Sequence, residues 1–223
     1  MSIDLIYICG LLATAAFAAS GVLAALGQRI DLFGAVVVAV VTAVGGGTLR
    51  DLILDVPVFW LYDQAWLLVA VITGCVAFFV RRYLDRHGDA LAYLDAMGVA
   101  LVAARALQKC SELGLPGLHG VALGVMTGIG GGLIRDTLTN RDTLLVSPEL
   151  YATPIILGLT LQYLSHHWMG VSSVTALFLG GGYYFHIEGP SHSIGSPHAD
   201  EYGELTVIRI KAWQNEGPLQ VGI

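Results

Sequence analysis

The chain has 223 residues, of which 55% are hydrophobic and only 13% are charged, and its formal net charge is −6. The charged fraction is about half that of an average soluble domain, in which about 25% of residues are charged. The mean hydropathy of +0.70 is correspondingly high. This composition excludes a disordered chain. It also excludes an ordinary soluble domain, because the long uncharged runs between residues 5 and 185 exceed what a soluble domain of this size can bury.

The first apolar run covers residues 5–27 and is preceded by a single charge, Asp4. A secretion signal would begin with a positive segment, so the run is interpreted as a retained first helix that spans the bilayer. Short polar turns separate the runs that follow, and no linker divides them. Further spans are predicted at about 33–49, 65–84, 90–110, 118–134 and 149–168, with a shorter one at 171–185. The pattern predicts an all-α polytopic membrane protein with seven transmembrane helices.

The distribution of Lys and Arg predicts the orientation, since cytoplasmic loops are enriched in these residues. In a seven-helix topology, most of them share one side, namely Arg29, Arg81, Arg82, Arg86, Arg135, Arg141, Arg209 and Lys211. The other side has only Arg50, Arg105 and Lys109. The N-terminus is therefore expected outside and the C-terminus in the cytoplasm, in the cell (inner) membrane. The basic residues form no stripe, so nucleic acid is not an expected partner.

An internal repeat is the most informative feature of the sequence. The stretch TAVGGGTLRD at 42–51 returns as TGIGGGLIRD at 127–136, with an offset of 85 residues. The offset pairs Thr42, Gly45, Gly46, Gly47, Arg50 and Asp51 with Thr127, Gly130, Gly131, Gly132, Arg135 and Asp136. Each unit holds three helices, so the second unit enters the membrane from the opposite side. We predict two inverted repeats, about 5–84 and 90–168, with the span at 171–185 as an addition.

Three consecutive glycines inside a helix disfavour it, at about 1 kcal/mol each relative to alanine. One interpretation is close packing between helices through small residues. The other is a kink or break at mid-membrane, where freed carbonyls face a water-filled path. Because both triplets would meet near the pseudo-twofold axis, the second interpretation predicts a pore or substrate site there.

An Arg-Asp pair follows each triplet, Arg50 with Asp51 and Arg135 with Asp136. Charges at mid-membrane are costly, so such residues face a polar cavity, pair with each other or mark a helix end. They are interpreted either as caps that hold a helix terminus or as gates and headgroup or anion contacts beside the pore. Asp95 is expected to have a structural role, and the role of Arg105 is left open.

These motifs resemble the prokaryotic relatives of the trimeric intracellular cation (TRIC) channels, a family also described as a glycine transporter or UPF0126 family. The resemblance rests on GGGTLRD, on PVFWL at 57–61, on LDAMGVAL at 94–101, on GIGGGLIRDTL and on ELYAT at 149–153. It implies a homotrimer with a potassium-permeable pore in each subunit, lined by the second and fifth helices. The glycines 45–47 and 130–132 would be the kinks, and Thr42 and Thr127 would be polar lining one turn earlier.

Residues 186–223 depart from the family, which ends in a longer seventh helix. This segment is expected to be non-membranous and disordered, either as a native tail or as the product of a shifted reading frame. Its three histidines, His186, His192 and His198, lie in a Gly-, Pro- and Ser-rich stretch that fixes no ligand geometry, so no metal site is expected.

The sequence therefore predicts passive transport of monovalent cations, potassium among them, with membrane lipids as further partners. No ring of carboxylates suggests a filter, so weak selectivity through carbonyls and hydroxyls is expected. A secondary transporter of glycine or another small zwitterion is the alternative, and a purely structural membrane protein is a third possibility. No nucleotide-binding fingerprint or catalytic triad is present, so neither an enzyme nor a cofactor is expected.

Overall fold

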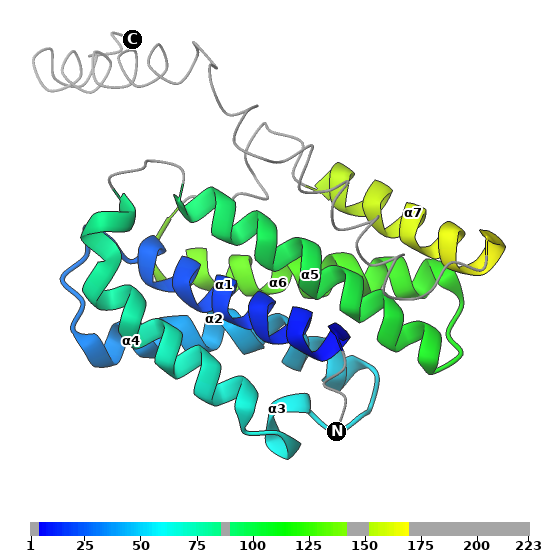
Figure 1. The fold of residues 1–223 in the computed structure, drawn as a ribbon, viewed down its shortest axis with the longest axis horizontal. Helices are drawn as coiled ribbons and strands as arrows, with labels where there is room; N and C mark the ends of the chain where they lie inside the picture. Colours follow the sequence, from blue (N-terminus) through cyan, green and yellow to red (C-terminus); the bar gives the residue numbers. More distant parts are fainter. Residues whose placement is uncertain (1–4, 86–89, 142–151, 170–223) are drawn as a thin grey trace, which may run out of the picture. The chain divides into compact units, whose positions relative to one another are not determined.

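A computed structural model describes residues 5–85, 90–141 and 152–169, all of which belong to a unit of residues 1–189. Every regular element in these ranges is a helix (Figure 1). The helices are α1 (Leu5–Ala24), α2 (Leu32–Ile53), α3 (Phe59–Tyr62), α4 (Ala65–Asp85), α5 (Ala90–Glu112), α6 (Gly117–Leu138) and α7 (Ala152–Met169). The short α3 is not anticipated by the sequence analysis. The span expected at 171–185 and the tail at 186–223 lie outside the described residues.

Four of the helices are long and apolar enough to cross a membrane, namely α1, α2, α5 and α6. In α4 the apolar stretch is shorter and covers Ala65–Arg81. The helices other than α3 coincide with the predicted spans from the first to the sixth, because hydropathy and length alone define such segments. The chain is thus an all-α, multi-pass membrane protein.

The 85-residue offset of the sequence motifs extends to the helix boundaries. It relates Leu5 to Ala90, where α1 and α5 begin, and it relates α2 as a whole to α6. The turns after α2 and α6 also match, because Asp55 has a φ of 52° and Asn140 a φ of 48°. Asp and Asn are the non-glycine residues that best tolerate this left-handed conformation. The two halves of the chain therefore share one local fold.

The equivalent helices of the two halves pack in opposite directions. The guanidinium of Arg105, late in α5, donates a hydrogen bond of 2.9 Å to the carbonyl of Ile6, early in α1. Conversely, Asp95 early in α5 and Ser20 late in α1 both bind the guanidinium of Arg135. Figure 1 shows α1 and α5 running side by side in this antiparallel manner. This is the arrangement that an inverted repeat requires.

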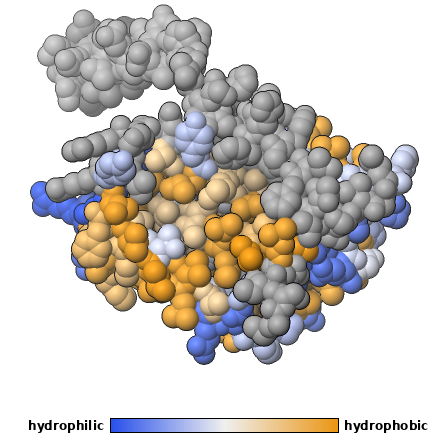
Figure 2. Space-filling model, in the orientation of Figure 1, coloured by the Kyte–Doolittle hydropathy of each residue, from blue (hydrophilic) through white to orange (hydrophobic). Residues whose placement is uncertain are grey.

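An apolar stripe on α4 faces away from the rest of the bundle. Leu68, Ile72, Val76 and Phe79 recur at helical spacing and are 56% to 74% exposed. Hydrophobic side chains dominate the described part of the face over α4 in Figure 2. A helix with such a face is stable in a lipid environment, where no apolar surface has to be shielded from water.

Candidate functional site

The two glycine triplets meet at the crossing of α2 and α6. A Cβ atom added to Gly46 would collide with the carbonyl oxygen of Thr127, and one added to Gly131 would lie 2.6 Å from the carbonyl oxygen of Thr42. Each contact is the repeat counterpart of the other, so the pseudo-twofold axis passes between them. Only glycine permits two helix backbones to approach this closely.

Both helices continue without interruption through their triplets. A break in the helix, one of the two interpretations of the triplets, is therefore absent from this structure, and close packing accounts for Gly46 and Gly131. The hydroxyls of Thr42 and Thr127 are buried at this junction and donate to the carbonyls of Val38 and Leu123, at 2.7 and 2.6 Å. The role of the triplets as pore-lining kinks stays a prediction.

The remaining glycines of the triplets have different neighbours. A Cβ on Gly45 would approach the end of the Ile134 side chain at 2.8 Å, and one on Gly47 would approach the Phe59 ring at 2.7 Å. Gly130 has room for a Cβ, because the nearest atom would be 3.4 Å away. Gly132 is buried in α6. The six glycines are thus not equivalent, although they are identical in sequence.

Arg135 is completely buried at the end of α6 and is held by carboxylates. Its guanidinium binds Asp136 at 2.8 Å and also forms an ion pair with Asp95 of α5. The Ser20 hydroxyl of α1 accepts a further hydrogen bond at 3.2 Å. These contacts link three helices, and they agree with the structural role expected for Asp95.

Arg50 and Asp51 occupy the equivalent position at the end of α2, in a different environment. The Asp51 carboxylate accepts from Arg50 at 2.7 Å and from Lys109 of α5 at 2.8 Å. Its second oxygen accepts from the backbone amide of Phe59 at 3.0 Å, which fixes the start of α3. The guanidinium of Arg50 lies 5.8 Å from the centre of the Phe59 ring. Two cations therefore share one buried carboxylate here.

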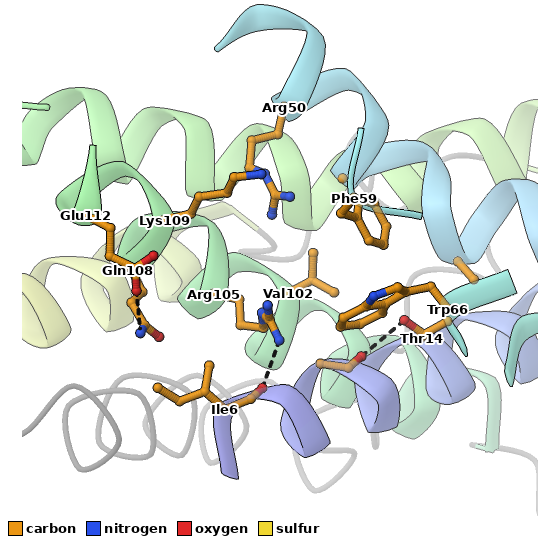
Figure 3. A pocket seen from close by; sticks show the side chains of 13 residues that line it. Ile6, Thr14, Arg50, Phe59, Trp66, Val102, Arg105, Gln108, Lys109 and Glu112 are labelled. Atoms are coloured by element: carbon orange, nitrogen blue, oxygen red, sulfur yellow. Dashed lines mark hydrogen bonds between the residues drawn. The ribbon is translucent and has the colours of Figure 1, made fainter. Parts of the chain in front are cut away.

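A cavity of about 230 Å³ lies beside this cluster, and we call it the charged cavity. Figure 3 shows basic side chains reaching it from α2 and α5, with the aromatic rings of Phe59 and Trp66 on the opposite side. Its lining residues are Ile6, Gly10, Thr14, Ala43, Gly47, Arg50, Phe59, Trp66, Val102, Arg105, Gln108, Lys109 and Glu112. The lining contains three cations, Arg50, Arg105 and Lys109. They are the same three basic residues that the predicted topology places on the outer side of the membrane.

Aromatic contacts fix the wall of the charged cavity. The ring of Trp66 makes edge contacts with Tyr7 and Phe59, with ring centres 5.4 and 5.2 Å apart.

The Tyr7 hydroxyl donates a 2.6 Å hydrogen bond to Asp63, in the loop before α4. This hydrogen bond lowers the pKa of Asp63 below its usual value. The hydrogen bond therefore stabilises the folded protein at neutral pH. This stabilisation is lost as the pH falls through the lowered pKa of Asp63.

Of the residues predicted for the site, only Gly47 and Arg50 line the charged cavity. The packed crossing of α2 and α6 holds Gly46 and Gly131, and the ion clusters hold Asp51, Arg135 and Asp136. Sequence analysis missed the part played by Lys109, Gln108 and Glu112, which follow each other along the end of α5. The unusual density of polar residues at the end of an otherwise apolar span is the signal that could have identified them. Among the described residues, no cluster of His, Cys, Asp and Glu is suited to hold a metal ion.

Comparison with known proteins identifies relatives over most of the chain. A family model described as "Glycine transporter" matches residues 7–82 and again residues 92–167, once in each repeat. The UPF0126 inner membrane protein YadS of Escherichia coli K12 is 39% identical over 178 residues, which cover 79% of this chain and 86% of the relative. A UPF0126 membrane protein of Vibrio cholerae is 39% identical over 179 residues, covering 79% of this chain and 74% of the relative.

The fold also matches a solved channel structure. The TRIC trimeric intracellular cation channel orthologue from Rhodobacter sphaeroides superposes with a TM-score of 0.78 and 28% sequence identity. The match covers 83% of this chain and 96% of that chain. The family model is thus described as a transporter, and the solved structure is that of a cation channel orthologue. The chain belongs to the Glycine transporter (UPF0126) family, the prokaryotic relatives of the TRIC channels.

Proposed function

We propose that the chain is a passive channel for monovalent cations, with potassium as the main ion, and that it assembles as a homotrimer with one pore in each subunit. The observation that carries this proposal is the fold shared with a trimeric cation channel orthologue over 96% of that chain's length. The pore is proposed to run beside α2 and α6, with the two glycine triplets and the two junction threonines near its narrowest part. The Arg-Asp pairs are proposed as gating elements or contacts with lipid headgroups.

Potassium flux through liposomes tests the channel directly. Purified protein reconstituted in liposomes loaded with potassium, with a protonophore added so that inward proton movement balances the charge, should release the ion at a rate that rises in proportion to the gradient and does not saturate. A channel behaves in this way because its sites bind ions weakly enough to let them leave. Empty liposomes are the control, and a potassium electrode gives the rate. The absence of protein-dependent release would refute the proposal.

The proposed topology places the N-terminus outside and the C-terminus in the cytoplasm. A reporter fused after residue 86 should read as cytoplasmic, and one fused after residue 113 should read as external, because the basic residues are concentrated on the first side. Green fluorescent protein and alkaline phosphatase fusions at both points measure this. The reverse pattern would refute the orientation.

A second candidate is the transport of glycine or another small zwitterion. The family description favours it, and so does the charged cavity, whose three cations suit a carboxylate. Saturable exchange of radiolabelled glycine, without macroscopic current, is the result expected for this function. The same liposomes serve both measurements, so the two candidates are compared in one preparation.

A further inference from the structure

The repeat relates the charged cavity to an equivalent region at the opposite end of the bundle. The charged cavity lies where α2 and α5 end. Applied to its lining residues, the 85-residue offset leads to the region where α6 and α1 end, which we call the inner region. The proposed topology places the inner region on the cytoplasmic side. The counterparts of Phe59 and Trp66, at positions 144 and 151, lie outside the described residues, so only α1, α2, α5 and α6 are compared.

The two regions differ in the exposure of equivalent helix faces. Four residues of α5 line the charged cavity and are partly exposed, namely Val102, Arg105, Gln108 and Lys109. Their counterparts on α1 are at most 2% exposed, and these are Phe17, Ser20, Leu23 and Ala24. The α5 face is thus open to the cavity, whereas the equivalent α1 face is closed.

Phe17 is the largest side chain on the closed face. A Cβ added to Gly98 of α5 would lie 2.8 to 3.0 Å from three carbons of the Phe17 ring, so the ring rests directly on this glycine. The counterparts of these two residues in the first half are Val102 and Ala13. The second half therefore combines a larger side chain on α1 with a smaller residue on α5, and the two changes together let the ring fill the inner region.

The Phe17 ring also reaches the crossing of α2 and α6. A Cβ added to Gly131 would lie 3.9 Å from the ring edge and 2.6 Å from the carbonyl oxygen of Thr42. One turn further along α1, the Ser20 hydroxyl accepts a hydrogen bond from the buried guanidinium of Arg135. The ring therefore lies between the crossing and the ion cluster of Arg135.

We propose that the Phe17 ring is the barrier that closes the path beside the crossing of α2 and α6, so that the charged cavity opens to the outer side only. The inference rests on the proposed channel, whose pore runs beside these two helices. An apolar constriction stops ions because it excludes water, and a close-packed ring leaves no room for it. Without the ring, the space would border the Thr42 carbonyl and the Ser20 hydroxyl, and a void beside such polar groups takes up water.

Thiol reactivity measures this barrier without any ion flux. The three native cysteines, Cys9, Cys75 and Cys110, are first replaced with alanine. Ser20→Cys then places a thiol in the inner region, and Gln108→Cys places one in the charged cavity. The protein in nanodiscs is treated with iodoacetamide, a small neutral reagent that alkylates exposed thiols, and mass spectrometry of the intact protein gives the rate. Gln108→Cys should react readily and Ser20→Cys slowly, because Ser20 has no exposed surface.

Phe17→Val gives the inner region the residue that the first half has at the equivalent position. It should raise the alkylation rate of Ser20→Cys by about tenfold or more, because the reagent then reaches the thiol without local unfolding. The rate of Gln108→Cys should not change. Phe79→Val is the matched control, since it makes the same substitution on the exposed apolar stripe of α4, and it should leave both rates unchanged.

Phe17→Leu keeps the test decisive if Phe17→Val does not fold. Leucine retains more of the buried volume than valine, so this variant loses less packing. It should give a smaller increase in the alkylation rate of Ser20→Cys, in the same direction. The thermal unfolding midpoint in nanodiscs shows which variants are folded.

Potassium release separates this inference from the channel proposal. In liposomes, Phe17→Val should release potassium faster than the parent protein, because the barrier in the path is smaller. Val102→Phe combined with Ala13→Gly reproduces the ring and its glycine in the first half and should slow the release. Faster alkylation of Ser20→Cys without potassium release from any variant would refute the channel and retain Phe17 as a barrier to water.

Two outcomes would overturn the inference. The first is an alkylation rate of Ser20→Cys that folded Phe17→Val and Phe17→Leu leave unaltered. The second is a conducting parent protein that releases potassium at the same rate as folded Phe17→Val. Neither outcome affects the channel proposal, which is decided by potassium release from the parent protein.

Discussion

Asp95→Ala is expected to lower the free energy of unfolding by about 3–5 kcal/mol, because it removes one partner of a buried ion pair. Arg135 and Asp95 each have only 1% of their side chain exposed. The truncation removes one carboxylate from a fully buried guanidinium, which keeps its contacts with Asp136 and the Ser20 hydroxyl. Denaturant unfolding of the purified protein in detergent, together with the yield of monodisperse protein, measures the loss.

Lys109→Ala is the matched control in the other half of the chain. The Lys109 side chain is 29% exposed, and Asp51 keeps Arg50 as a partner when the lysine is removed. A partly exposed ion pair contributes at most about 1 kcal/mol. If Asp95→Ala and Lys109→Ala lower the free energy of unfolding equally, the greater burial of the Arg135–Asp95 pair does not make it more important for stability than the Asp51–Lys109 pair.

Gly131→Ala is expected to disrupt the crossing of α2 and α6. Its Cβ would lie 2.6 Å from the backbone carbonyl oxygen of Thr42, which cannot move without moving the helix. Overpacking of this kind costs about 1–3 kcal/mol, and it outweighs the gain of about 1 kcal/mol in helix propensity.

The double variant Gly46→Leu with Gly131→Leu should insert into the membrane and lose potassium flux, because both sides of the junction are then forced apart.

Gly130→Ala is the matched control for this effect. It changes the neighbouring residue in the same way, but its Cβ would be 3.4 Å from the nearest atom. It should unfold at the same temperature as the parent protein or at a higher one, and it should conduct normally. Equal unfolding temperatures for Gly130→Ala and Gly131→Ala would show that the contacts at the crossing do not determine stability. Potassium flux that survives in the double leucine variant would show that they do not determine conduction.

The sequence determined much of the fold without any structure. Hydropathy and segment length predict the long helices α1, α2 and α4 to α7, but not the short α3, because a membrane span depends on local composition and on the thickness of the bilayer. The recurrence of GGG and RD at an offset of 85 residues predicts the inverted repeat, since three helices in each unit force the second unit to enter from the opposite side. Neither inference needs to know how any helix is rotated about its axis.

The tertiary structure decided which contacts the residues of the repeated motifs make. The identical triplets did not reveal that Gly46 and Gly131 meet a backbone carbonyl whereas Gly130 does not, because that depends on which face of each helix is turned toward the other. Nor did the sequence show that Asp51 and Lys109, 58 residues apart, share an ion pair. Such contacts arise from helix rotation and crossing, which are fixed by packing over the whole bundle and leave no local signal in the sequence.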